Sequence, residues 1–365
     1  MRNADQYCII MAGGNGSRFW PISRNSKPKQ FLDIIDHGRT FLQEIFRRFE
    51  KIMYTENIYV VTSQEYTELV KEQIPSIRPE NILAEPHRRN TAPCIAYATY
   101  KILKKNRNAC AVVTPADNLI LDEAKFLETM KIALDYSAAH NELLTIGVKP
   151  TRPETVYGYI QINRQDMARI EGQVSYGVKT FTEKPDEALA KVFVDSGEFL
   201  WNSGIFIWNL QTIAAEMEKY IPEIAHSFKD GMHLYDTINE KHFIKEVYES
   251  VNGTSISFGV MEKTSRTRVF VADFDWSDLG TWPSLYKHAP KDANLNLIKA
   301  DNVLLEGVKG SVVITSKKGK LIAVNGLEDY MIVDTDDVLM ICPKNVKAIK
   351  NLMTDLALND LSEFQ

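Results

Sequence analysis

Residues 7–31 read YCIIMAGGNGSRFWPISRNSKPKQF, and this stretch decides the fold class. Residues 7–12 are continuously apolar, which is typical of a strand buried on both faces of a parallel sheet. The strand breaks into a loop with Gly13, Gly14 and Gly16. Main-chain N–H groups in such a loop can cradle a phosphate, and a tight turn without a ligand is the alternative. The stretch therefore predicts an α/β fold whose first strand leads into a candidate phosphate-binding loop.

The loop lacks the features of two common nucleotide-binding motifs. The dinucleotide-binding fingerprint requires a third glycine at the position where Phe19 stands. The chain also has no Lys-Ser or Lys-Thr pair at the spacing of a Walker P-loop. Both a hydride-transferring Rossmann enzyme and a P-loop ATPase are therefore disfavoured.

A series of cations follows the loop. Several cations directed at one polyphosphate would neutralise it in place, and a solvated charged surface is the alternative. Two prolines among them stiffen the backbone. We assign the phosphate role first to Arg18 and Lys29, and only second to Arg24 and Lys27. In chain order the cations and prolines are Arg18, Pro21, Arg24, Lys27, Pro28 and Lys29.

Strand-like and helical segments alternate through the first 150 residues. Short apolar runs near Ile58, Ile82, Ala109 and Leu143 predict further buried strands. Residues 41–49 and 126–134 carry apolar side chains at helical spacing between those runs. Alternating strands and helices predict a Rossmann-like, doubly wound sheet.

The pattern changes after Pro150. Residues 157–162 and 174–185 predict longer strands of a mixed sheet, and Asp186 begins a helix. Residues 210–251 predict an extended helical region. Residues 301–342 alternate β-branched runs with turn residues, which predicts a small all-β, β-helix-like module closed by a helix over 345–358. We predict two domains, a catalytic domain over 1–290 and a β-rich domain over 291–365.

Composition limits the class of protein. A chain of 365 residues is long enough for two domains at about 150 residues each. The 43 Lys and Arg against 48 Asp and Glu give a net charge of −5, which argues against a nucleic-acid partner. The four cysteines form no C-x-x-C pair, and no apolar run approaches the roughly 18 residues of a membrane span. We expect reduced core thiols and a cytoplasmic protein that binds no membrane.

Six motifs in order carry a family resemblance. The chain resembles the nucleotidyltransferases that make sugar nucleotides, and among them the mannose-1-phosphate guanylyltransferases, or GDP-mannose pyrophosphorylases. The motifs are AGGNGSRFWPISRNSKPKQF (12–31), EPHRRNTAP (85–93), TPADNLI (114–120), FTEKPD (181–186), WNSGIFIW (201–208) and DWSDLGTW (275–282).

The resemblance implies a reaction and its substrates. The expected reaction is Mg²⁺-dependent transfer of GMP from GTP to α-D-mannose 1-phosphate by direct in-line attack, giving GDP-mannose and pyrophosphate. Another sugar 1-phosphate or another nucleotide is the close alternative. A catalytically silent, regulatory sugar-nucleotide-binding subunit is the distant one, although such a subunit could lose the metal carboxylates or loop cations that are present here. A sugar phosphate is already ionised at neutral pH, so alignment and charge neutralisation would suffice without a general base.

Two carboxylates are the candidate metal ligands. Asp117 follows a predicted strand, where α/β sheets place ligands, and Asp278 lies in WSDLGTW. A cap or turn role is the alternative for each. Mg²⁺ is usually held by one or two carboxylates together with substrate phosphate oxygens. The resemblance implies that Asp117 and Asp278 are this pair, with Asp275 as the fallback.

The resemblance also assigns the substrate contacts. Asn90 or Thr91 could instead be the N-cap of a following helix, and Lys184 with Glu183 could instead be a salt-bridged strand end. Asn118 departs from the family pattern, which commonly has His there. The expected nucleotide-binding residues are Gly13, Gly14, Asn15, Gly16, Ser17, Glu85, Asn90 and Thr91, and those for the sugar phosphate are Gly158, Glu183, Lys184 and Asn202.

Two further expectations concern the end of the chain. The β-rich tail carries apolar runs with few charges, which suits packing on the main domain or on a second copy, and we expect a homodimer through it. The sequence stops at Gln365 without the isomerase domain of longer bifunctional members, so a single activity is expected.

Overall fold

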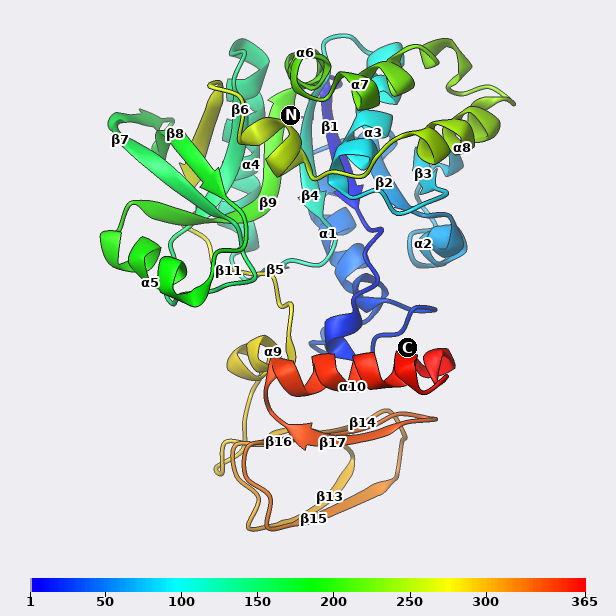
Figure 1. Cartoon of the computed structure of the whole chain (residues 1–365), viewed down its shortest axis with the longest axis vertical. Coiled ribbons are helices and arrows are strands. Elements are labelled where there is room, and N and C mark those ends of the chain that lie inside the picture. Colours follow the sequence, from blue (N-terminus) through cyan, green and yellow to red (C-terminus); the bar gives the residue numbers. More distant parts are fainter. Residues whose placement is uncertain (1) are drawn as a thin grey trace. The chain divides into compact units, whose positions relative to one another are not determined.

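The computed structural model describes residues 2–365, and Ser17 by its backbone only. The chain forms two compact units, each described here by itself (Figure 1). Unit 1 comprises Met1–Gly13, Leu42–Ala116 and Ile120–Trp276, and unit 2 comprises Gly14–Phe41, Asp117–Leu119 and Ser277–Gln365. These units divide the chain differently from the predicted boundary at residue 290, which stays a prediction.

Unit 1 is built on a nine-stranded mixed sheet. Its first half holds β1 (Gln6–Met11), β2 (Ile58–Ser63), β3 (Ile82–Glu85) and β4 (Cys110–Pro115) in the order β3-β2-β1-β4, and all neighbours are parallel. The connecting helices are α1 (Phe41–Glu50), α2 (Thr67–Gln73) and α3 (Thr91–Lys105). This order confirms the doubly wound arrangement that the alternating pattern predicted.

The second half of the sheet is mixed, as the longer strands predicted. Strand β9 (Phe199–Asn209) runs antiparallel to both β4 and β6 (Leu143–Val148), so it reverses direction in the middle of the sheet. The order continues β9-β6-β10-β8-β7, with β7 (Tyr159–Ile170), β8 (Gln173–Thr182) and β10 (Thr267–Val271). The helices of this half are α4 (Glu123–Ala139), α5 (Glu187–Ser196), α6 (Leu210–Tyr220), α7 (Pro222–Lys229) and α8 (Glu240–Ser250).

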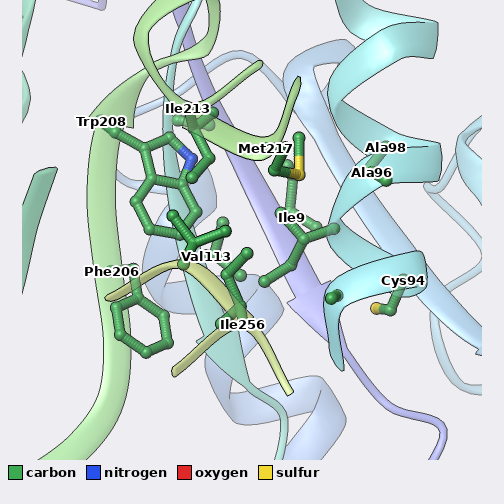
Figure 2. Packing of buried hydrophobic residues seen from close by; sticks show 14 of the residues in the cluster. Ile9, Cys94, Ala96, Ala98, Val113, Phe206, Trp208, Ile213, Met217 and Ile256 are labelled. Carbon is green, nitrogen blue, oxygen red and sulfur yellow. The ribbon is translucent and has the colours of Figure 1, made fainter. Parts of the chain in front are cut away.

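The core of unit 1 lies between the sheet and its helices. Ile9 of β1 and Val113 of β4 pack with Trp208 of β9 and with Met217 of α6 (Figure 2). Continuous apolar strands are buried on both faces here, because helices cover both sides of a doubly wound sheet. All four cysteines are buried, as expected for core residues.

Unit 2 contains the predicted β-rich module. Strands β12 (Leu297–Lys299), β14 (Val312–Thr315) and β16 (Tyr330–Asp334) form one parallel ladder, and β13 (Asn302–Glu306) and β15 (Leu321–Asn325) form a second. Strand β17 (Leu339–Pro343) closes the first ladder in antiparallel orientation. Successive turns of the chain add parallel strands to the same two ladders, which is the arrangement of a short, irregular β-helix-like coil.

Two helices of unit 2 flank this coil in the sequence. Helix α9 (Trp282–His288) precedes it, and α10 (Val346–Leu358) follows it with Asn345 as N-cap. Side chains of both helices join one apolar cluster with Phe19, Trp20 and Phe41 of the N-terminal segment. The short strands β5 (Leu119–Ile120) and β11 (Trp276–Ser277) each straddle a boundary between the units. Every helix among the described residues is too short or too polar to span a bilayer.

Candidate active site

The ends of two neighbouring strands lead into the candidate site. Strands β1 and β4 are paired in register, with Met11 opposite Pro115. Strands β2 and β3 lie on one side of β1 and β4 lies on the other, so the strand order reverses between β1 and β4. In such sheets ligands bind beyond the carboxyl ends of the strands at the point where the order reverses. The glycine-rich loop follows β1, and Asp117 follows β4. Of these two segments, Gly14–Phe41 and Asp117–Leu119 belong to unit 2.

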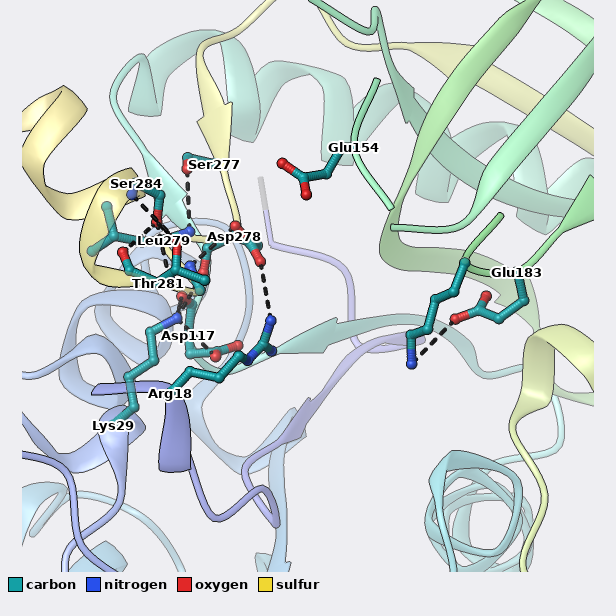
Figure 3. Close-up of polar contacts among 12 residues, drawn as sticks. Arg18, Lys29, Asp117, Glu154, Glu183, Ser277, Asp278, Leu279, Thr281 and Ser284 are labelled. Atoms are coloured by element: carbon teal, nitrogen blue, oxygen red, sulfur yellow. Dashed lines mark hydrogen bonds and ion pairs between the residues drawn. The ribbon is translucent and has the colours of Figure 1, made fainter. Parts of the chain in front are cut away.

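Lys29 ties the two carboxylate-bearing loops together. Its side chain is only 3% exposed. The ammonium group donates to the carbonyl oxygen and to Oδ2 of Asp117, both at 2.9 Å, and to the carbonyl oxygen of Asp278 at 2.6 Å (Figure 3). The rings of Phe19 and Phe41 lie 5.9 and 5.0 Å from the same nitrogen. Three protein oxygens therefore match the three ammonium hydrogens, so Lys29 joins the two loops, and its predicted contact with the substrate phosphates stays a prediction.

Asp278 sits in a strained turn that faces Arg18. Its Oδ1 accepts the Gly280 N–H at 3.0 Å, and its Oδ2 lies 4.0 Å from a guanidinium nitrogen of Arg18 (Figure 3). Leu279 has a φ of 39°, a backbone strain that clusters at functional sites. The Arg18 side chain is 52% exposed. An exposed guanidinium beside a loop carboxylate is available to a polyphosphate.

Asp275 has a different environment from Asp278. It is exposed, and its carbonyl oxygen accepts the N–H of Leu121 at 3.1 Å. The turn that carries Asp278 is the one bound by Lys29. This geometry favours Asp278 over Asp275 as the partner of Asp117.

The glycine-rich loop is held by the segment that carries Lys29. The amide of Gln30 donates to the Gly14 carbonyl at 2.7 Å. Gly16 has a φ of 61°, and a Cβ there would lie 2.7 Å from the main-chain nitrogen of Lys29, so only glycine fits. Among the described hydrogen bonds, none is donated by the main-chain amides of Gly14, Asn15 and Gly16. The phosphate-binding role of these loop residues stays a prediction, and the side chain of Ser17 lies outside the described residues.

The remaining cations of the series do not share this environment. Arg24 forms an ion pair with Asp337 at 2.6 Å and is 14% exposed. Lys27 is exposed. The structure thus separates four cations that look alike in sequence into a buried organiser, an exposed arginine beside a carboxylate, a protein-bound arginine and a surface lysine.

Glu85 is a buried carboxyl at the end of β3 in unit 1. It accepts a hydrogen bond from the Tyr248 hydroxyl of α8 at 2.9 Å. Burial raises the pKa of Glu85 to about 7, while the Tyr248 hydrogen bond and the charge of Arg88 lower it. A Cβ on Gly13 would lie 3.0 Å from Oε2 of Glu85, so this oxygen faces the start of the glycine-rich loop. A carboxyl in this place can accept from a polar ligand edge.

Asn90 and Thr91 have clear structural roles. Asn90 is the N-cap of α3, and its side chain accepts from the Thr91 N–H at 2.8 Å. The Thr91 hydroxyl accepts the N–H of Ile256 at 2.9 Å. The N-cap interpretation therefore holds for Asn90, and the nucleotide contact of both residues stays a prediction.

The predicted sugar-phosphate residues meet in unit 1. The Gly158 carbonyl accepts the Asn202 N–H at 2.8 Å, and a Cβ on Gly158 would lie 2.8 Å from Oε2 of Glu183. Lys184 has a φ of 43°, is 65% exposed, and lies 3.7 Å from Oε1 of Glu183. Its N–H donates to the Tyr157 carbonyl at 3.2 Å. An exposed ammonium beside a carboxylate and an amide suits a phosphorylated polyol.

Sequence reasoning missed several neighbours of these residues. Tyr248, 163 positions from Glu85, carries no motif that would have revealed the pair. Ser257 begins a π-helix (Ser257–Met261) and accepts from the Asn202 amide at 3.4 Å, and such turns are frequent at functional sites. Burial, then the charge of Glu183, raises the pKa of Glu262 just after that turn. The segment ISFGVMEK gave no periodic signal that would have marked it.

Comparisons with known proteins identify the family of the chain. The nucleotidyl transferase family model matches residues 7–294. The chain is 35% identical to the alginate biosynthesis protein AlgA of Pseudomonas aeruginosa, covering 98% of this chain and 73% of that protein. It is 33% identical to a mannose-1-phosphate guanylyltransferase of Escherichia coli, covering 97% of this chain and 76% of that protein.

A solved structure resembles the whole chain. The protein from Thermus thermophilus described as a mannose-1-phosphate geranyltransferase superposes with a TM-score of 0.84 at 26% identity, covering 97% of this chain and 99% of the other. The strand order and the matched length show a shared fold. The chain therefore belongs to the nucleotidyl transferase family, and it is similar over nearly its whole length to members named mannose-1-phosphate guanylyltransferase.

Proposed function

We propose that the protein transfers GMP from GTP to α-D-mannose 1-phosphate, giving GDP-mannose and pyrophosphate. One observation supports it most: Lys29 bonds to the loops of both Asp117 and Asp278, with Arg18 exposed beside Asp278. Paired carboxylates next to an exposed cation suit a metal-bound polyphosphate. The name mannose-1-phosphate guanylyltransferase, carried by relatives at 33–34% identity, supplies the choice of mannose and GTP.

The proposed reaction requires alignment of the two substrates and neutralisation of their charge, and it requires no acid–base catalysis. A phosphate oxygen of mannose 1-phosphate attacks the α-phosphorus of GTP, forming one P–O bond. The bond from the α-phosphorus to the bridging oxygen breaks in line with it, and pyrophosphate leaves with that electron pair. The nucleophile is already an anion, so no protein base has to remove a proton. Arg18 neutralises the triphosphate, and Lys29 keeps Asp117 and the Asp278 turn in place.

The carboxylates fit a Mg²⁺ ion shared with substrate. Among the described residues there is no cluster of three or more His, Cys, Asp or Glu that would form an all-protein cage. Two hard oxygen ligands from Asp117 and Asp278 leave positions for phosphate oxygens, which is how Mg²⁺ is commonly bound. Bound there, the ion would supply charge neutralisation at the phosphates.

The other predicted residues divide between the substrates. The amides of Gly14, Asn15 and Gly16 hold the phosphates, and Glu85 with Asn90 and Thr91 lies against the nucleoside. Glu183, Asn202 and the close backbone at Gly158 bind sugar hydroxyls, and Lys184 binds the sugar phosphate. An unmatched buried polar group costs about 1–3 kcal/mol, so full pairing at Glu85 rejects a base with the wrong edge.

Pyrophosphate release across a panel of nucleoside triphosphates and sugar 1-phosphates tests the proposal. The expected result is highest kcat/KM for GTP with mannose 1-phosphate, and loss of turnover when Mg²⁺ is chelated. Asp117→Ala is expected to lose turnover with an unchanged circular dichroism spectrum. Clear turnover of a different pair, without turnover of this one, would replace the substrate assignment. No turnover of any pair would favour the regulatory subunit.

We also propose that the protein is a cytoplasmic homodimer. The outward faces of the β module carry Leu304, Leu321, Leu339 and Ile341, each more than half exposed. Exposed apolar side chains on both ladders of the β module suit burial against a second copy. Four buried free thiols suit a reducing compartment. Light scattering that gives a monomer mass at working concentration would contradict the dimer.

A further inference from the structure

The last residues of the chain hold the segment that follows the phosphate loop. The Phe364 carbonyl accepts the indole N–H of Trp20 at 2.6 Å and an Arg24 guanidinium N–H at 2.8 Å. The Gln365 carbonyl accepts the main-chain N–H of Asn25 at 3.0 Å. All of these residues belong to unit 2. These hydrogen bonds join residues 364–365 to residues 20–25.

Each guanidinium nitrogen of Arg24 donates a hydrogen bond to the protein. Its Nε donates to the Pro21 carbonyl at 2.7 Å, and its Nη2 reaches Asp337 at 2.6 Å and the Thr335 hydroxyl at 3.5 Å. With the Phe364 carbonyl on Nη1, every guanidinium nitrogen has a protein acceptor. A guanidinium bound in this way joins segments of the protein and does not face a phosphate, although the cation series alone made it a phosphate candidate.

The terminal residues are themselves fixed to α10. The Leu361 N–H donates to the Leu356 carbonyl at 2.9 Å, and the Gln365 amide donates to the Met353 carbonyl at 3.0 Å. Leu356 and Met353 pack against the apolar cluster that contains Trp20. The terminal segment is thus held both by hydrogen bonds and by a helix that packs on the loop.

The contacts continue from Trp20 to the two candidate catalytic loops. The Trp20 carbonyl accepts the indole N–H of Trp282 at 3.1 Å, and Trp282 begins the helix just after the Asp278 turn. Its ring lies 5.3 Å from that of Phe19, which follows Arg18 and flanks the Lys29 ammonium. Trp20 is therefore linked to Lys29 and to the Asp278 turn through Trp282 and Phe19, and Phe19 is the chain neighbour of Arg18.

We propose that residues 361–365 form a latch that positions the phosphate loop, with Trp20 and Arg24 as the positioning residues that receive it. The latch acts on the geometry of Arg18 and of the Asp278 turn and touches no substrate. Its effect on turnover rests on the proposed function. Its effect on the order of residues 14–25 does not rest on that function, because it depends only on hydrogen bonds within the protein.

The test compares the full chain with a chain that ends at Leu361. The removed residues, 362–365, are exposed or half-buried, so unit 2 keeps its apolar cluster. The matched control is Glu363→Ala, because that exposed side chain can be removed while the Phe364 and Gln365 carbonyls remain. A second variant, Arg24→Gln, keeps a polar side chain but loses the Asp337 ion pair.

Two readouts are measured on each protein. Hydrogen–deuterium exchange of residues 14–25 is expected to speed up about tenfold in the shortened chain and in Arg24→Gln, and to stay unchanged in Glu363→Ala. The KM for GTP is expected to rise about tenfold with little change in the KM for mannose 1-phosphate, since the loop serves the nucleotide. A purely structural role would instead lower the active fraction and leave both KM values unchanged.

The outcomes separate the latch from the reaction. Unchanged exchange of residues 14–25 in both variants overturns the latch. Faster exchange with an unchanged KM for GTP, in a protein that turns over, overturns its role in positioning the loop. Faster exchange in a chain whose full-length form releases no pyrophosphate from any substrate pair supports the latch and rejects the proposed reaction.

Discussion

Replacing Lys29 by methionine tests the central contact of the candidate site. Methionine has a similar length and suits the space between Phe19 and Phe41, so the change removes the charge and three hydrogen bonds while leaving little cavity. Asp117 and the two carbonyls would lose their shared donor. The variant thus asks whether Lys29 organises the carboxylates.

The stability cost follows from burial and from the partners. Removing one member of a buried ion pair costs about 3–5 kcal/mol. The Asp117 side chain is 37% exposed, so water replaces part of that contact, and the two carbonyls lose charged hydrogen bonds instead. We expect a loss of about 2–4 kcal/mol in the free energy of unfolding. Thermal unfolding against wild type measures it.

The loss of activity in Lys29→Met is expected to exceed what partial unfolding of the protein would cause. A displacement of about 1 Å in a reacting geometry can cost about 10²-fold, so kcat/KM is expected to fall about 10²- to 10³-fold while most of the protein stays folded. Lys27→Met is the matched control, because Lys27 is exposed and two residues away. Pyrophosphate release measures both. Activity of Lys29→Met within about threefold of this control would refute the organising role.

A double-mutant cycle isolates the pair itself. If Lys29 acts through Asp117, then Lys29→Met lowers the free energy of unfolding less in an Asp117→Asn background than in wild type. Contacting residues commonly show a coupling of about 0.5–3 kcal/mol. Additive effects would show that the lysine works independently of Asp117.

Three further changes have defined outcomes. Because burial raises the pKa of Glu85 from 4.5 to about 7, folding stability falls as pH rises across that range; Glu85→Gln removes this loss, so its Tm relative to wild type should rise from pH 5 to 8 in thermal scans, and a pH-independent difference would contradict the shift. Gly16→Ala meets the Lys29 backbone at 2.7 Å with a positive φ, so GTP turnover should drop by more than about tenfold; normal kinetics would exclude the tight closure. Gly158→Ala displaces Glu183 and should raise the KM for mannose 1-phosphate but not for GTP, and equal increases in both KM values would argue against a sugar role.

Local patterns accounted for the elements that position the site. The apolar run of β1, the glycine loop and the helical stripe of α1 are each contained in a short window, and the structure has them where the sequence predicted them. Motif order likewise led to the family, because the loops that carry Arg18, Asp117, Glu183 and Asp278 are recognisable as short strings. Secondary structure and recognition loops are decided by neighbours in the chain.

The partners of those residues were decided only by the tertiary structure. The sequence presented Arg18, Arg24, Lys27 and Lys29 as one series of similar cations. Folding assigns Arg24 to Asp337 and Phe364, more than 300 positions away, and buries Lys29 against Asp117 and Asp278. Glu85 meets Tyr248 in the same way. The role of a cation or of a buried carboxyl depends on the oxygen or hydroxyl that packing places beside it. That partner lies far away in the sequence, and no local pattern specifies which residue it is.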